Sequence, residues 1–104
     1  MKAIMNGKRY NTETAAELGV ASANGMSVSD FKYWREGLYR TPKGAYFLSG
    51  EGGGLSQFAE SSGNGWGWGT RVTVVTREQA IAWLERHELL TELEEHFADA
   101  IEDG

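Results

Sequence analysis

The 104-residue chain contains no cysteine and only one proline. Without cysteine it has no disulfide, no thiolate metal site, no iron–sulfur cluster and no cysteine nucleophile. No apolar run approaches the roughly 18 residues needed to cross a bilayer. The first segment, MKAIMNGKRY, turns polar after five residues, so a signal-peptide core is not expected. The composition predicts one soluble cytoplasmic domain, residues 1–104.

Complete cofactor and metal motifs are also lacking. The phosphate-binding pattern GxxxxGKS/T needs a lysine, and none follows Lys43. The dinucleotide pattern GxGxxG is interrupted at both glycine clusters, where its third glycine should stand. His87 and His96 do not have the i, i+4 spacing of a helical metal pair. We therefore expect no metal ion and no cofactor.

Catalytic residues are not assigned, and a non-enzymatic protein is predicted. The segment 54–58 resembles a nucleophile elbow but lacks its final glycine. Two alternatives stay open. Ser56 could act with a distant histidine and acid, and Glu51 with Glu60 could form a carboxylate pair for acid–base chemistry. Neither alternative has a complete set of nucleophile, base and orienting group.

Charge is distributed unevenly around a net value of -5. Residues 1–76 hold eight bases and six acids, a net +2, whereas residues 77–104 hold two bases and nine acids, a net -7. An acidic pole attracts basic protein surfaces and accelerates encounters with them. The alternative is a merely solvated helix face. The predicted partner-binding acids are Glu88, Glu92, Glu94, Glu95, Asp99, Glu102 and Asp103.

Glycine is abundant, and eight of the fourteen glycines lie between residues 50 and 69. There the run GWGWG places two tryptophans at a spacing of two, which points both rings to one side of an extended segment. Exposed rings would form a stacking platform for a sugar or base, or anchors for a protein. Alternatively, they cap the core beside Val72. Trp66 and Trp68 complete the predicted partner-binding set.

A β-hairpin is predicted at residues 3–10, because Asn6-Gly7 is the strongest two-residue signal for a type I′ turn. In that register Met5 faces Lys8. Residues 12–29 are expected to serve mainly as a connection, with a short helical turn over residues 12–18.

Further strands are predicted at residues 31–39, 45–49 and 71–75. Gly37 is expected to mark a bulge in the first of them. Pro42 and Gly44 predict a tight turn over residues 41–44.

Two helices are predicted at the C-terminal end, with a break near residues 88–91. Thr76 and Gln79 fit a capping box for the first helix, and Thr91 and Glu94 fit one for the second. Five strand signals followed by two helices predict an α+β domain. We expect an antiparallel sheet of about five strands with both helices packed on one face.

A basic, aromatic run at residues 32–35, with Arg40, Lys43, Lys8 and Arg9, could form a nucleic-acid-binding sheet face. The isoelectric point near 5.0 opposes this interpretation, because an acidic domain loses non-specific attraction to phosphates. Direct nucleic-acid binding is therefore not expected.

A resemblance adds a class of partner. The chain resembles a group of small proteins carried by phages, plasmids and conjugative elements. The likeness rests on residues 7–15, 38–48, 50–53, 59–60, Ser56, Trp83 and Glu85. Some accessory proteins of such elements are anti-CRISPR inhibitors, which bind a Cas effector and block its nucleic-acid-binding surface or its conformational change. This chain departs from the pattern in its acidic tail after His96.

The resemblance and the charge pattern together predict a non-enzymatic inhibitor that binds a basic protein partner such as a Cas effector, in the cytoplasm of a host bacterium. The acidic residues would mimic phosphate charge, and the two tryptophans would supply apolar anchors. The alternative is a small-ligand or single-stranded nucleic-acid binding module that uses the Gly/Trp loop and the basic aromatic strand.

Overall fold

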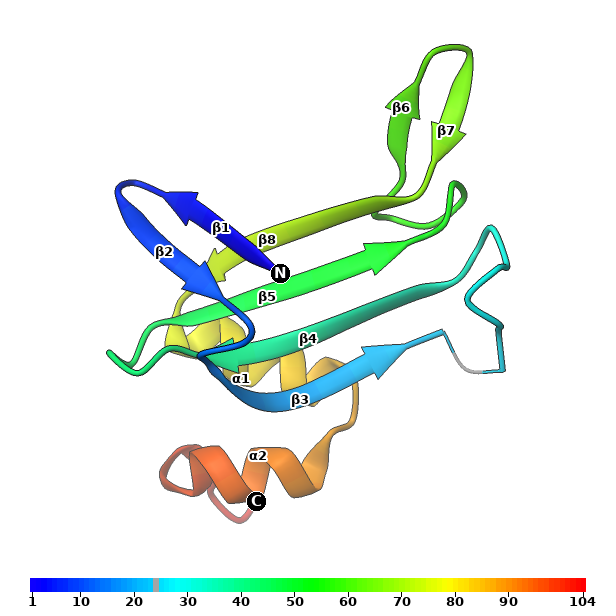
Figure 1. Ribbon diagram of the computed structural model, residues 1–104. Coiled ribbons are helices and arrows are strands. Elements are labelled where there is room, and N and C mark those ends of the chain that lie inside the picture. Colours follow the sequence, from blue (N-terminus) through cyan, green and yellow to red (C-terminus); the bar gives the residue numbers. More distant parts are fainter. Residues whose placement is uncertain (24) are drawn as a thin grey trace.

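A four-stranded antiparallel sheet forms the centre of the molecule, and Figure 1 shows it with a hairpin on one side and the helices on the other. The computed structural model describes residues 1–23 and 25–104. In these residues the strands are β1 (Lys2–Met5), β2 (Lys8–Asn11), β3 (Ala16–Ser22), β4 (Trp34–Arg40), β5 (Tyr46–Gly52), β6 (Glu60–Ser62), β7 (Gly65–Gly67) and β8 (Gly69–Val75). The helices α1 (Arg77–Arg86), α2 (Leu90–Phe97) and the 3₁₀ helix η1 (Ala98–Ala100) follow.

The strand order β3-β4-β5-β8 gives β5 an inner position, where it pairs with β4 and β8 along its whole length. Successive side chains of a strand point to opposite faces of a sheet. Tyr46 and Leu48 therefore contact the helix-side core, and Phe47 contacts the hairpin side. This alternation gives the sheet two apolar faces, each of which needs a cover.

The helices cover one face. Trp83 of α1 is enclosed there, and its indole N–H donates to Glu36 Oε1 at 2.8 Å, so its polar atom is satisfied. Full burial of a large apolar side chain contributes about 1.5–3 kcal/mol, so this core stabilises the packing of both helices on the sheet. Its buried members are Leu18, Leu38, Ala80, Trp83, Leu84, Leu93 and Phe97.

A smaller aromatic core lies on the opposite face, under the hairpin β1–β2. Tyr10 meets Phe47 edge-on, with ring centroids 5.6 Å apart. Tyr39 stacks on the same ring at 5.3 Å. Both tyrosines and Phe47 are buried, so the hairpin is fixed to the sheet by aromatic packing.

The predicted hairpin register is confirmed, with Met5 opposite Lys8. Asn6 and Gly7 form the turn, and their φ angles of 52° and 76° are those that a type I′ turn requires. The two turn residues are therefore enough to specify this hairpin and its register.

The helical turn predicted over residues 12–18 is present only at its start, where Ala15 N–H donates to Asn11 O at 3.1 Å. Its second half is wrong, and residues 12–29 are more than a connection. Residues Ala16–Ser22 form β3, which pairs with β4 and has a bulge between Glu17 and Gly19. Pairing with a neighbouring strand overrides the helix propensity of this segment. A Cβ at Gly19 would lie 3.0 Å from Leu84 Cδ2, so the glycine permits close helix packing.

The other predicted strands are present with shifted ends, and the turn over residues 41–44 is confirmed, with Gly44 at φ 91°. The bulge predicted at Gly37 is wrong, because Gly37 pairs in regular register with Ser49. A Cβ at Gly37 would lie 2.8 Å from the Tyr39 ring. Glycine is needed there to seat an aromatic ring, not to bend the strand.

The α+β class is confirmed, and the antiparallel sheet that the helices cover has four strands where about five were expected. Among the described residues, β1 and β2 pair only with each other, and β6 and β7 form another two-stranded ribbon. The central sheet has four strands because the hairpin packs on its face instead of extending its edge.

The first capping box is confirmed and the second is wrong. Gln79 N–H donates to Thr76 Oγ1 at 3.1 Å, and Thr76 N–H donates to Gln79 Oε1 at 2.8 Å. Helix α2 begins at Leu90, with Leu89 as an N-cap that makes no side-chain hydrogen bond. The C-terminal closure of α1 leads directly into α2, so Thr91 lies inside the helix.

Substitution of Gly69 by alanine should destabilise the protein, because a Cβ there would collide with the Phe58 backbone carbonyl. We expect a loss of about 1–3 kcal/mol in the free energy of unfolding, measured by urea denaturation. Gly67→Ala is the matched control, since a Cβ at Gly67 has no heavy atom within 4 Å. Equal losses in both variants would contradict the close packing at Gly69.

Candidate functional site

The predicted acids lie on and around α2, on the helix side of the sheet (Figure 1). Glu92 is half-buried, and the others are exposed. We call one set of these residues the acidic helical surface: Glu88, Glu92, Glu94, Glu95, Glu102 and Asp103.

Asp99 is placed differently from the other predicted acids. Its two carboxylate oxygens each accept a hydrogen bond from Arg77 at 2.7 Å. The Arg77 guanidinium also lies over the Phe97 ring, 5.3 Å from its centroid. Asp99 thus ties η1 to the start of α1, and its charge is balanced within the fold.

The carboxylates of the acidic helical surface are not balanced in this way. In residues 1–23 and 25–104, no lysine or arginine nitrogen lies within 4.0 Å of them. Glu95 approaches His96 Nε2 at 4.0 Å, and that histidine carries charge only when protonated. The negative charge predicted for the C-terminal quarter therefore faces solvent.

Glu88 has an unusual backbone, with a φ of 56°. Its N–H donates to Glu85 O, and the Leu89 N–H donates to Leu84 O, each at 3.0 Å. These bonds close α1 as a Schellman motif, in which the residue at this position is usually glycine. A left-handed backbone costs a non-glycine residue about 1–2 kcal/mol. The two hydrogen bonds of the motif hold Glu88 in this conformation.

Exposed apolar side chains gather at one end of the sheet. Phe31 is 72% exposed, Leu55 68%, Trp66 68% and Trp68 43%. The Trp68 ring stacks on Tyr33, with centroids 6.1 Å apart and planes 12° apart. We call these five residues the aromatic tip. Solvent-exposed aromatic groups in such a cluster are typical of a binding surface.

The backbone of the aromatic tip is held by hydrogen bonds between separate loops. Leu55 N–H donates to Phe31 O, and Gly53 N–H donates to Tyr33 O, both at 2.8 Å. A Cβ at Gly54 would lie 2.7 Å from Trp66 O. The glycine cluster therefore brings backbone against backbone, as the sequence pattern allowed.

The interpretation of the two tryptophans as part of the core does not hold, because neither ring belongs to a buried cluster. Sequence reasoning missed Phe31 and Leu55 as members of the same surface. Phe31 carried the signal of a strand, but it lies before β4 in the β3–β4 loop. Leu55 gave no signal, because only the folded backbone places it beside Phe31.

The structure separates the acidic residues from the tryptophans. The β6–β7 ribbon projects beyond one end of the sheet on the hairpin side, whereas α2 lies beneath the opposite face (Figure 1). The acidic helical surface and the aromatic tip are therefore two distinct surfaces.

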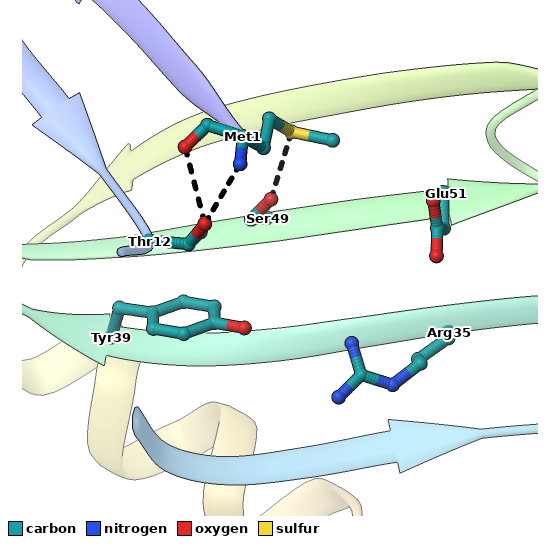
Figure 2. A pocket seen from close by; sticks show the side chains of 6 residues that line it. All are labelled: Met1, Thr12, Arg35, Tyr39, Ser49 and Glu51. Atoms are coloured by element: carbon teal, nitrogen blue, oxygen red, sulfur yellow. Dashed lines mark hydrogen bonds between the residues drawn. The ribbon is translucent and has the colours of Figure 1, made fainter. Parts of the chain in front are cut away.

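A polar pocket of about 200 Å³ lies on the hairpin side of the sheet (Figure 2). The Met1 ammonium donates to Thr12 Oγ1 at 2.9 Å, and Ser49 Oγ donates to Met1 Sδ at 2.9 Å. Arg35 and Glu51 lie at the same side of the pocket in Figure 2. The pocket holds one of the two carboxylates considered for acid–base chemistry.

The remaining catalytic alternatives have structural roles. Glu60 Oε1 accepts from Thr70 N–H at 3.4 Å, at the base of the β6–β7 ribbon. Ser56 Oγ donates to Gly53 O at 2.8 Å and accepts from Phe58 N–H at 3.2 Å, within a turn. These contacts engage the serine hydroxyl as both donor and acceptor.

His87 lies between α1 and the sheet, in contact with two tryptophans. His87 packs against Trp83 and Trp34, with centroids 4.7 and 6.0 Å away. Burial, followed by the neighbouring Arg86 charge, lowers the pKa of His87 below 6.5, and Glu36 opposes the shift. In the part of the chain that the structure describes, no three metal-ligating side chains form a group.

None of the family models, curated proteins or solved structures compared with the chain matches it. In the described residues, no helix has the length and apolar character required to span a membrane.

The lowered pKa of His87 predicts a pH-dependent stability. As pH falls through about 6.5, the unfolded state takes up the proton before the folded state does, so stability is lost. Replacement by glutamine removes this titration. Urea unfolding at about pH 7 and about pH 5.5 should show a smaller loss for His87→Gln than for the wild type. Equal losses would contradict a lowered pKa.

Proposed function

We propose that this protein is a non-enzymatic binding module whose acidic helical surface docks onto a basic groove of a protein partner. The observation that supports this proposal is the set of exposed carboxylates without a lysine or arginine within 4.0 Å in the described residues. Such carboxylates are available to cations of another molecule.

The physical basis is competition for sites that bind phosphate. A short helix and tail with closely spaced carboxylates present a charge density of the same sign as a nucleic-acid backbone. Long-range attraction raises the rate of encounter with a cationic groove, and salt screens it over about 8–10 Å. A partner that binds nucleic acid is therefore the class of protein that this surface fits.

The aromatic tip provides a second contact in this proposal. Trp66 and Phe31 are large and exposed. Trp66 lies in the paired ribbon β6–β7, and Phe31 lies in a loop where its carbonyl accepts from Leu55 N–H, so less entropy is lost when they bind. Because the tip and the acidic helical surface lie at separate places, the partner would have to extend around the molecule to contact both.

The resemblance to proteins of mobile elements extends the proposal to a specific partner. We propose a Cas effector as the target, with the protein acting as a phage- or plasmid-encoded anti-CRISPR inhibitor. Its acidic helical surface would occupy the cationic channel that otherwise holds nucleic acid. No bond is made or broken in this mode of inhibition.

Reversal of charge at Glu94 and Glu95 should lower the association rate constant with a purified Cas effector, immobilised on the sensor surface, about tenfold at low salt. It should also flatten the dependence of that rate on ionic strength, as measured by surface plasmon resonance. Glu13→Lys/Glu17→Lys is the matched control, since it makes the same change in net charge at exposed residues outside α2 and outside the aromatic tip. If the control variant slows association as much as the reversal at Glu94 and Glu95 does, the effect comes from net charge and not from the acidic helical surface.

Glu88→Gly separates stability from binding. Glycine relieves the left-handed strain, so the free energy of unfolding should rise by about 0.5–1 kcal/mol. Binding to the same effector should weaken, because one carboxylate of the surface is lost. Asn6→Gly is the control, as it places glycine at another left-handed position in the hairpin turn and should leave binding unchanged. A stabilised Glu88→Gly protein with unaltered binding would exclude Glu88 from the interface.

A further inference from the structure

A cavity of about 510 Å³ lies between two tight turns on the hairpin side of the sheet. Lys8 and Arg9 of β2 line it on one side, and Lys43 of the β4–β5 turn lines it on the other. Tyr10, Pro42 and Ala45 contribute apolar surface. We call this cavity the basic groove.

The cations of the basic groove have no acidic partner within the described fold. No aspartate or glutamate oxygen in residues 1–23 and 25–104 lies within 4.0 Å of Lys8, Arg9 or Lys43. The first acidic residue of the chain is Glu13, so the whole hairpin carries positive charge alone. Arg9 alternates with Lys8 and Tyr10 along β2, so its guanidinium lies on the outer face of the hairpin. Lys8 and Lys43 therefore bring two positive charges to the cavity from opposite walls, which favours an anion within it.

The walls of the basic groove are fixed before any ligand arrives. The turn that carries Lys43 is closed by three hydrogen bonds between Thr41, Gly44 and Ala45, at 2.8, 2.9 and 3.0 Å. The opposing hairpin is anchored by the buried Tyr10 ring against Phe47. A preorganised site loses less entropy on binding than a mobile one.

The net negative charge of the protein does not describe this side of the molecule. Residues 77–104, which carry the net -7, form the helices on the other face of the sheet. Tyr10 and Ala45 belong to the hairpin-side cluster, so the basic groove opens on the opposite side. The sheet separates the two charges.

We propose that the basic groove binds the phosphate of a nucleotide, either free or within single-stranded nucleic acid. A nucleotide joins an anionic group to a broad flat ring, and the groove joins cations to an apolar surface in a volume typical of small-ligand sites. A glutamate side chain of an acidic peptide has the negative charge but no flat ring, so it would leave the apolar surface of the groove uncovered. This site is independent of the acidic helical surface and of the proposed function.

The test uses fluorescence anisotropy of a labelled single-stranded DNA of about 12 nucleotides with the intact protein. With Lys8 and Lys43 on phosphates, the logarithm of the binding constant should fall with the logarithm of salt concentration at a slope of about -1.4. Lys8→Ala/Lys43→Ala should weaken binding about tenfold or more and bring the slope close to zero. Lys2→Ala/Arg86→Ala makes the same change in net charge outside the groove and should leave both values unchanged.

Competition identifies the ligand. Adenosine monophosphate and unlabelled DNA are compared as competitors at equal total phosphate concentration. If adenosine monophosphate displaces the labelled DNA as well as unlabelled DNA does, the groove binds a free nucleotide; if it displaces the labelled DNA poorly, the groove binds single-stranded nucleic acid. Displacement by polyglutamate as readily as by unlabelled DNA would overturn the nucleotide assignment. No binding at about 50 mM salt, or equal weakening in both double variants, would overturn the site itself.

Discussion

The alternation of side chains along β5 is the constraint on which the rest of the structure depends. Tyr46 and Leu48 point to one face of the sheet and Phe47 to the other. Because β5 is paired on both edges, it cannot rotate to take either apolar side away from solvent. Each face therefore needs its own apolar cover. The C-terminal helices supply one and the N-terminal hairpin supplies the other. Because the chain ends differ in charge, covering the two faces also assigns opposite charge to opposite sides of the molecule.

Close backbone contact at the far end of the sheet depends on glycine. A Cβ at Gly52, Gly53 or Gly54 would lie 2.6–2.7 Å from a carbonyl oxygen of another segment, and these oxygens belong to Tyr33, Phe31 and Trp66 respectively. The loops can therefore pack as layers of bare backbone. Their side chains are directed outward as a consequence, which explains why so many large apolar residues are exposed there.

Some features of the candidate surfaces follow from the sequence, and others depend on contacts between distant residues. The acidity of the last quarter was readable, since formal charge needs no fold, and most of its carboxylates do face solvent. The pairing of Asp99 with Arg77 was not readable, because it joins residues whose approach depends on how η1 returns toward α1. The basic groove was equally hidden. Lys8 and Lys43 are far apart in sequence, and only packing of the hairpin on the sheet makes them neighbours.

By itself, the sequence determined the elements that local chemistry controls. These are the Asn6-Gly7 hairpin, the capping box of Thr76, the C-terminal helices and the α+β class, since turn conformation and helix capping depend on residues a few positions apart. Tertiary structure alone decided that residues Ala16–Ser22 form a strand and that the hairpin covers a face of the sheet. Strand pairing and face packing are set by partners distant in sequence, and their free energy exceeds the small local preference of an Ala/Glu/Leu segment for helix.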